Sequence, residues 1–94
     1  MQRGGTVYIL TNVHHKVLYT GVTADLLIRI REHKERKHIN SFSSKYNVNK
    51  LVYYKSYSTI EEAIAEEKRI KAGNRNQKIT LIQLMNAAWR DLWE

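Results

Sequence analysis

The residue that most strongly suggests chemistry is Glu67, a carboxylate that interrupts an apolar helical pattern. It follows Ala63 by four residues and Ile64 by three, so in a helix it shares their face. A carboxylate on an apolar face is costly unless it is paired with a cation or bound to a metal. The pattern therefore leaves two interpretations, a functional carboxylate or a buried salt bridge with a base on the first helix.

Four further side chains suit chemistry at a phosphate. Arg29 and His33 are four residues apart and neighbours on one helix, and a guanidinium can hold a phosphate through two hydrogen bonds. Tyr8 and Tyr19 fall in two neighbouring strand-like segments. Two phenols can accept or relay a proton from water if a nearby cation or metal lowers their effective pKa. The ordinary alternatives are an arginine at the edge of an amphipathic helix and tyrosines that pack in a sheet.

Weaker signals come from Gly21 and Lys45. Gly21 follows Tyr19 by two residues, where a strand-end glycine allows close approach of a ligand or another backbone, or simply forms a turn. Lys45 is a candidate nucleic-acid contact because it precedes Tyr46, an aromatic ring of the kind that stacks on a base. The sequence has no glycine-rich phosphate loop and no Ser-His-Asp order.

The hydrophobic pattern predicts the elements that must position these residues. Residues 6–12, 16–22 and 51–57 are apolar or β-branched and predict three strands, the first two joined as a hairpin. Helices are expected over residues 24–37 after a Thr23 cap, over 60–71 after a Thr59 cap, and from about 75 to 86. The second of these helices is expected to bury Ile60, Ala63, Ile64 and Ile70. The order β-β-α-β-α-α predicts an α+β fold, a three-stranded antiparallel sheet flanked by helices.

Length and composition set the limits of this fold. The chain has 94 residues, which predicts one domain over 1–94, with residues 1–5 as a loose tail. It contains no cysteine, so disulfides and thiolate zinc sites are excluded. Because there is also no long apolar run and no export pattern, we expect a cytoplasmic protein without a membrane span.

The charge of the chain points to nucleic acid as its partner. Sixteen Lys and Arg residues against nine Asp and Glu give a formal net charge of +7. The excess is clustered, because the stretch from Lys68 to Lys78 contains basic residues and no acidic one. Clustered bases replace counterions on phosphates, whereas the simpler explanation is a well-solvated surface.

Three short motifs, in this order, resemble the GIY-YIG endonuclease family. They are Val7-Tyr8-Ile9, Tyr19-Thr20-Gly21, and Asp25-Leu26 followed by Arg29 and His33. Glu67 falls where that family places its metal-binding glutamate, and the tail from Lys78 to Leu92 is similar to small stand-alone bacterial members. The chain departs from the family at Val7 and Thr20, and at Ala72-Gly73-Asn74, where small members often carry tryptophan and arginine.

The resemblance implies an endonuclease that hydrolyses phosphodiester bonds, most simply in DNA, including branched or single-stranded DNA in repair. It implies one divalent ion, Mg²⁺ or Mn²⁺, held by Glu67, since magnesium often takes only one or two carboxylates. It further implies that Arg29 holds the phosphate and that His33 contacts phosphate or relays a proton. One of the two tyrosines, Tyr8 or Tyr19, helps to deprotonate the attacking water and the other positions the water or the phosphate; both assignments stay open, and Tyr8 is the preferred base. The resemblance also makes Lys71 and Asn74 candidate contacts to nucleic acid at the periphery of the site.

Two alternatives to catalysis remain at the level of sequence. The first is a nucleic-acid-binding module of the same fold without useful activity, and the second is an interaction protein that presents Met85, Trp89 and Trp93 to a partner. Large apolar residues at helical spacing more often fill the core of their own domain than bind a partner. Many members of the family carry a separate DNA-binding domain, so a protein partner is a possible source of specificity here.

Overall fold

The computed structural model describes residues 4–35 and 48–93 of the chain. It contains β1 (Gly5–Thr11), β2 (Leu18–Thr23), α1 (Leu26–Lys34), β3 (Lys50–Tyr57), α3 (Ile60–Ala72) and α4 (Arg75–Met85). The predicted α+β class and the element order β-β-α-β-α-α are confirmed. The first strand begins at Gly5, a buried residue that the sequence had assigned to the N-terminal tail. No helix among the described residues is long and apolar enough to cross a membrane.

The central strand of the sheet is β1, which pairs antiparallel with both other strands in the order β2-β1-β3. Tyr8 lies opposite Gly21 of β2, and Leu10 lies opposite Tyr19. An irregularity in the pairing of β1 with β3 occurs between Ile9 and Leu10. The hairpin predicted for the first two strands is therefore confirmed, and it brings Tyr8 and Tyr19 onto one face of the sheet as diagonal neighbours.

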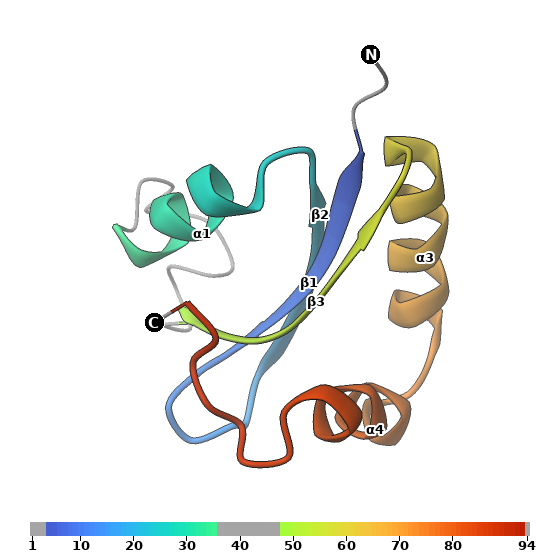
Figure 1. The fold of residues 1–94 in the computed structure, drawn as a ribbon. Helices are drawn as coiled ribbons and strands as arrows, with labels where there is room; N and C mark the ends of the chain where they lie inside the picture. Colours follow the sequence, from blue (N-terminus) through green and yellow to red (C-terminus); the bar gives the residue numbers. More distant parts are fainter. Residues whose placement is uncertain (1–3, 36–47, 94) are drawn as a thin grey trace.

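Helices cover both faces of the sheet, with α1 on one side and α3 on the other (Figure 1). The side chains of β1 alternate between two cores, as expected for a strand buried on both faces. Val7 and Ile9 belong to the cluster packed by α3 and α4. Tyr8 and Leu10 belong to the cluster that includes Ile30 of α1. The candidate base Tyr8 is thus a core residue, and its position is fixed by packing.

Capping explains where the helices begin and corrects one prediction. The first helix begins at Leu26 after an Asp25 cap, later than predicted, and ends at Lys34. Thr23 instead forms a local turn, in which its Oγ1 accepts from the backbone N–H of Asp25 at 3.1 Å. The predicted cap Thr59 is confirmed, since its side chain accepts from the N–H of Glu62. Asn74 caps α4 through a reciprocal pair of hydrogen bonds with Gln77.

The sheet-facing side of α3 differs from the prediction at two residues. Ala63 and Ile70 are buried as expected, but Ile60 is only partly buried and Ile64 is exposed. Successive helical residues are rotated by about 100°, so Ile64 turns away from the sheet when Ala63 faces it. Glu67 lies close to the line from Ala63 to Ile70, and its side chain is only 13% exposed. The inference that Glu67 lies on the packed side of its helix is therefore correct.

The segment after α4 is held to the rest of the fold by Asp91. Its carboxylate accepts from Lys34 Nζ of α1 at 2.7 Å and from the backbone N–H groups of Leu51 and Trp93. Trp89 and Trp93 each pack against one of the two cores, which favours self-packing over a partner-binding role for these tryptophans. Met85 is exposed. Asp91 thereby ties the helix that carries Arg29 and His33 to the sheet.

We expect Asp91→Asn to lower the stability of the protein at neutral pH and to lose this effect in acid. Burial alone would raise the pKa of Asp91, but hydrogen bonds from Lys34 and two backbone amides outweigh it and lower the pKa. A lowered folded-state pKa stabilises the protein above the unfolded value of about 3.9, and this contribution is lost as the pH falls through the folded-state pKa. Urea unfolding midpoints of both proteins across pH test this. A stability gap that persists unchanged below the folded-state pKa would contradict it.

Candidate active site

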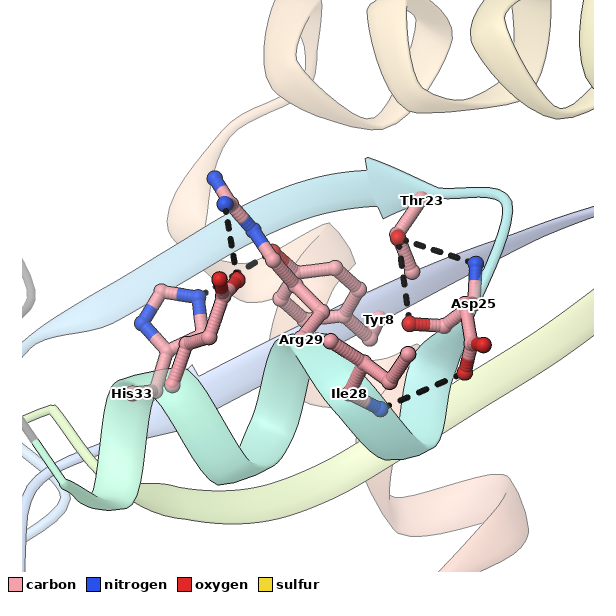
Figure 2. A network of polar contacts seen from close by, with 7 residues as sticks. Tyr8, Thr23, Asp25, Ile28, Arg29 and His33 are labelled. Carbon is pink, nitrogen blue, oxygen red and sulfur yellow. Dashed lines mark hydrogen bonds and ion pairs between the residues drawn. The ribbon is translucent and has the colours of Figure 1, made fainter. Parts of the chain in front are cut away.

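The core of the candidate site is a hydrogen-bonded trio of Tyr8, Arg29 and His33 (Figure 2). The hydroxyl of Tyr8 lies 3.2 Å from His33 Nε2 and accepts from Arg29 Nε at 3.4 Å. Arg29 and His33 are one turn apart on α1, and both side chains extend toward the Tyr8 hydroxyl at β1. The structure therefore joins three of the residues that the sequence singled out.

The direction of these contacts defines what Tyr8 can do. A guanidinium only donates hydrogen bonds, so the Tyr8 oxygen is the acceptor from Arg29. The phenolic proton can then go to His33 Nε2 in the tautomer in which that nitrogen carries no proton. Burial raises the pKa of Tyr8 above its usual value, and the hydrogen bond from Arg29 offsets only part of this. Tyr8 therefore remains a neutral phenol at neutral pH, suited to passing a proton on to His33.

Gly21 makes room for the ring of Tyr8 on the neighbouring strand. A Cβ atom at position 21 would lie 2.5 Å from both Cζ and the hydroxyl oxygen of Tyr8, which is much closer than atoms normally approach. Gly21 has no positive φ, so the requirement at this position is for space and not for backbone freedom. The sequence placed Gly21 among possible nucleic-acid contacts, whereas its contact in the structure is with Tyr8.

We expect Gly21→Ala to displace the Tyr8 hydroxyl and to reduce both stability and activity. An added methyl group in a packed site typically costs about 1–3 kcal/mol. The ring of Tyr8 is 1% exposed and cannot swing into solvent without opening the core. Unfolding midpoints and nuclease rates measure the two effects separately. A variant with wild-type rate would show that the exact position of Tyr8 is unimportant.

Tyr19 stands beside this trio on the same face of the sheet. Its ring centroid lies 6.4 Å from that of Tyr8 and 5.6 Å from the imidazole of His33. His33 is 8% exposed and meets both tyrosine rings edge-on. The two tyrosines thus enclose the imidazole from the sheet side and restrict the orientations that its ring can adopt.

Arg29 also contacts Glu32, a residue that the sequence did not single out. Arg29 Nη1 lies 3.4 Å from Glu32 Oε1, and the Arg29 side chain is 37% exposed. The spacing of three residues on a helix is the signal that would have identified this pair. Two anchors, Tyr8 and Glu32, orient the guanidinium, and the part left exposed is available to an anionic ligand.

Glu67 forms an ion pair within its own helix. Its Oε2 atom lies 2.9 Å from Lys71 Nζ, so its salt-bridge partner belongs to α3 and not, as one interpretation had it, to the first helix. The negative charge of Glu67 is one of the smaller influences that raise the pKa of Tyr8.

The remaining predicted contacts have different outcomes. Lys71 borders a hollow of about 300 Å³ together with Tyr19, so it lies next to the site. The side-chain oxygen of Asn74 caps α4, a role that the sequence analysis missed although Asn followed by Gln three residues later is a recognisable cap. Lys45 lies outside the described residues.

Comparison with known proteins identifies the family of this chain. The model of the GIY-YIG catalytic domain family matches residues 4–80, which include Tyr8, Tyr19, Arg29, His33 and Glu67. The chain belongs to the GIY-YIG family.

Relatives of similar size support this membership. A UPF0213 protein of Staphylococcus epidermidis is 36% identical over 66 residues, covering 70% of this chain and 79% of the relative. A UPF0213 protein of Syntrophus aciditrophicus is 31% identical over 77 residues, covering 82% and 87%. The solution structure of a UPF0213 protein from Bacillus halodurans has a TM-score of 0.59 and 27% identity, covering 94% of this chain and 92% of that one. These proteins are small GIY-YIG family members, and the GIY-YIG domain places the chain in a nuclease superfamily that acts on nucleic acid.

The donor set of this GIY-YIG domain fits a divalent ion that keeps most of its water. Among residues 4–35 and 48–93, no group of three or more His, Cys, Asp or Glu side chains could hold a metal. A fully protein-bound ion such as a structural zinc is therefore not supported in this part of the chain. A single, partly exposed carboxylate such as Glu67 instead matches Mg²⁺, which is often bound through one or two carboxylates, waters and substrate phosphate.

Proposed function

We propose that this protein is a divalent-metal-dependent endonuclease that hydrolyses phosphodiester bonds in DNA. The observation that carries the proposal is the Tyr8–Arg29–His33 trio, because it combines a phosphate-binding cation with a path for a proton. A packed core places the trio, and its cation remains partly exposed.

In the proposed reaction, water attacks phosphorus while its proton moves through Tyr8. As the new P–O bond forms and the P–O bond to the leaving oxygen breaks, the water proton passes to the Tyr8 oxygen, and the phenolic proton passes to His33 Nε2. The leaving oxygen departs with the electron pair of the broken bond and takes up a proton from solvent. Tyr8 ends the step neutral and His33 ends it as an imidazolium, so no tyrosinate has to accumulate despite the raised pKa of Tyr8. This relay modifies the simpler expectation that Tyr8 alone is the base.

Arg29 stabilises the negative charge that develops at phosphorus, and Glu67 would hold a metal ion that stabilises the leaving oxygen. The exposed part of the Arg29 guanidinium holds the non-bridging oxygens, as an anchored guanidinium can do without moving during the reaction. Glu67 would hold a magnesium or manganese ion, which when bound supplies stabilisation of the leaving oxygen. Tyr19 positions the water and the His33 ring from its place beside Tyr8.

The test is a panel of duplex, branched and single-stranded DNA, with RNA counterparts, incubated with the protein and Mg²⁺. We expect cleavage of DNA that stops when EDTA removes the metal, while binding of the same DNA in EDTA persists. Binding of DNA without cleavage under any metal condition would contradict the proposed hydrolysis and would indicate a nucleic-acid-binding module of the same fold. Cleavage that continues in EDTA would contradict the proposed metal role.

A further inference from the structure

Two lysines from different helices close a hollow against strand β2. The hollow, of about 300 Å³, is lined by Leu18, Tyr19 and Thr20 of β2, Lys71 of α3 and Lys78 of α4. Within the described sheet, β2 is an outer strand, so the hollow lies where an extended ligand can reach Tyr19 from the sheet edge. Lys78 was not among the residues that the sequence singled out.

Each of the two ammonium groups contacts an acceptor within the protein, Lys71 a carboxylate and Lys78 a backbone carbonyl. Lys71 Nζ pairs with Glu67 at 2.9 Å, and the Lys71 side chain is 54% exposed. Lys78 Nζ donates at 3.3 Å to the backbone carbonyl of Gly73, just after α3. An ammonium has three N–H donors and each of these contacts uses one, so both lysines can bind an anion without leaving their present positions.

The other basic residues of this stretch have different roles. Arg69 is paired with Glu66, and Arg75 Nη2 donates at 2.7 Å to the backbone carbonyl of His15. Lys68 is exposed on α3 and does not line the hollow. The basic run is therefore not a uniform positive surface, because two of its members converge on the space beside Tyr19.

We infer that Lys71 and Lys78 bind a backbone phosphate of DNA that neighbours the phosphate to be cut. This inference rests on the proposed function and adds a subsite to it. The chemistry is the ordinary pairing of ammonium groups with a phosphodiester, and the position beside Tyr19 places this phosphate next to the reacting one. Because Lys71 forms an ion pair with Glu67, the affinity of the subsite for phosphate depends on the charge of that carboxylate.

The experiment measures binding of a labelled duplex oligonucleotide by fluorescence anisotropy, in EDTA and at several salt concentrations. Lys71→Gln and Lys78→Gln should each weaken binding several-fold and lower the slope of log affinity against log salt by about 0.9. Lys68→Gln, on the same helix but away from the hollow, should leave both quantities as in the wild type. Lys78→Arg keeps the charge and should keep the slope, which separates lost charge from altered folding.

Glu67→Gln gives an independent and opposite signal in the same assay. Removal of the carboxylate charge frees Lys71, so this variant should bind DNA several-fold more tightly than the wild type in EDTA. The gain should vanish in the double variant Glu67→Gln/Lys71→Gln. No change in affinity in the single variant, or a gain that survives in the double variant, would overturn the coupling between Glu67 and Lys71.

The two proposals fail in distinguishable ways. A wild-type protein that cleaves DNA, with Lys71→Gln and Lys78→Gln binding as well as Lys68→Gln, would overturn the subsite and leave the nuclease intact. A wild-type protein that cleaves nothing, with both lysine variants defective in binding, would support the subsite and contradict hydrolysis. If the wild type does not bind DNA in EDTA, the subsite is refuted whatever the activity with metal.

Discussion

Replacement of Glu67 by glutamine is expected to reduce DNA cleavage by about a hundredfold or more while leaving the fold intact. An amide of the same shape keeps the packing on α3 but is neutral and a much weaker ligand for Mg²⁺ than a carboxylate. A bound metal contributes several kcal/mol of charge stabilisation to such reactions, and each 1.4 kcal/mol changes the rate by about tenfold. Single-turnover cleavage at saturating protein measures the effect on the chemical step.

A neighbouring carboxylate provides the matched control for this experiment. Glu66 lies on the same helix, is also partly buried and is also paired with a basic residue, Arg69. We expect Glu66→Gln to cleave at a rate close to that of the wild type, because Glu66 interacts with Arg69, Lys55 and Tyr57, none of which belongs to the proposed site. Equal rates for the wild type and Glu67→Gln, or an equal loss in Glu66→Gln, would remove Glu67 from its proposed role.

Replacement of Arg29 by alanine is expected to reduce the cleavage rate by about a hundredfold to a thousandfold. Loss of one donor that stabilises developing charge typically has an effect of this size. Arg29 also donates to Tyr8 and pairs with Glu32, so the variant loses part of the support of the Tyr8 hydroxyl as well. Single-turnover rates, compared with DNA affinity in EDTA, show whether the loss lies in chemistry or in binding.

Arg29→Lys and Arg31→Ala are the controls for this prediction. Lysine keeps the charge but not the planar fork, so Arg29→Lys should recover only part of the rate. Arg31 is exposed on the same helix, and its removal should change salt-dependent binding at most. A rate in Arg31→Ala as low as in Arg29→Ala would mean that the net charge of α1 matters and that the geometry of Arg29 does not.

Local signals in the sequence were sufficient for most of the fold. Runs of apolar and β-branched residues identified the strands, and the Thr59 cap identified the start of α3. The predicted end of the last helix near residue 86 matches the end of α4 at Met85. The predicted start of α1 was wrong because Thr23 and Asp25 are both good capping residues. Which of them caps the helix depends on the turn in which the Thr23 side chain binds the backbone of Asp25. The exposure of Ile64 was missed for a similar reason, since the axis orientation of α3 on the sheet is set by tertiary packing.

The site was predictable as a set of residues but not as a set of contacts. Glu67 was conspicuous from helical spacing, whereas Tyr8, Tyr19 and Arg29 became candidates only through the family motifs. The hydrogen bond between Tyr8 and His33 joins residues 25 positions apart, and the closure of the hollow by Lys78 requires the placement of α4 beside β2. Such long-range contacts leave no periodic trace in the sequence.

Under the proposed mechanism, the burial of Tyr8 ties the activity of this protein to its stability. Tyr8 is among the largest fully buried side chains and also carries the hydroxyl at the centre of the site. Loss of a large buried ring costs about 3–5 kcal/mol, a major part of the roughly 5–15 kcal/mol by which a domain is stable. Substitutions that loosen the core between the sheet and α1 will therefore also misplace the reacting group. If the proposed mechanism holds, selection for a well-packed core and selection for catalysis act on the same atoms of this domain.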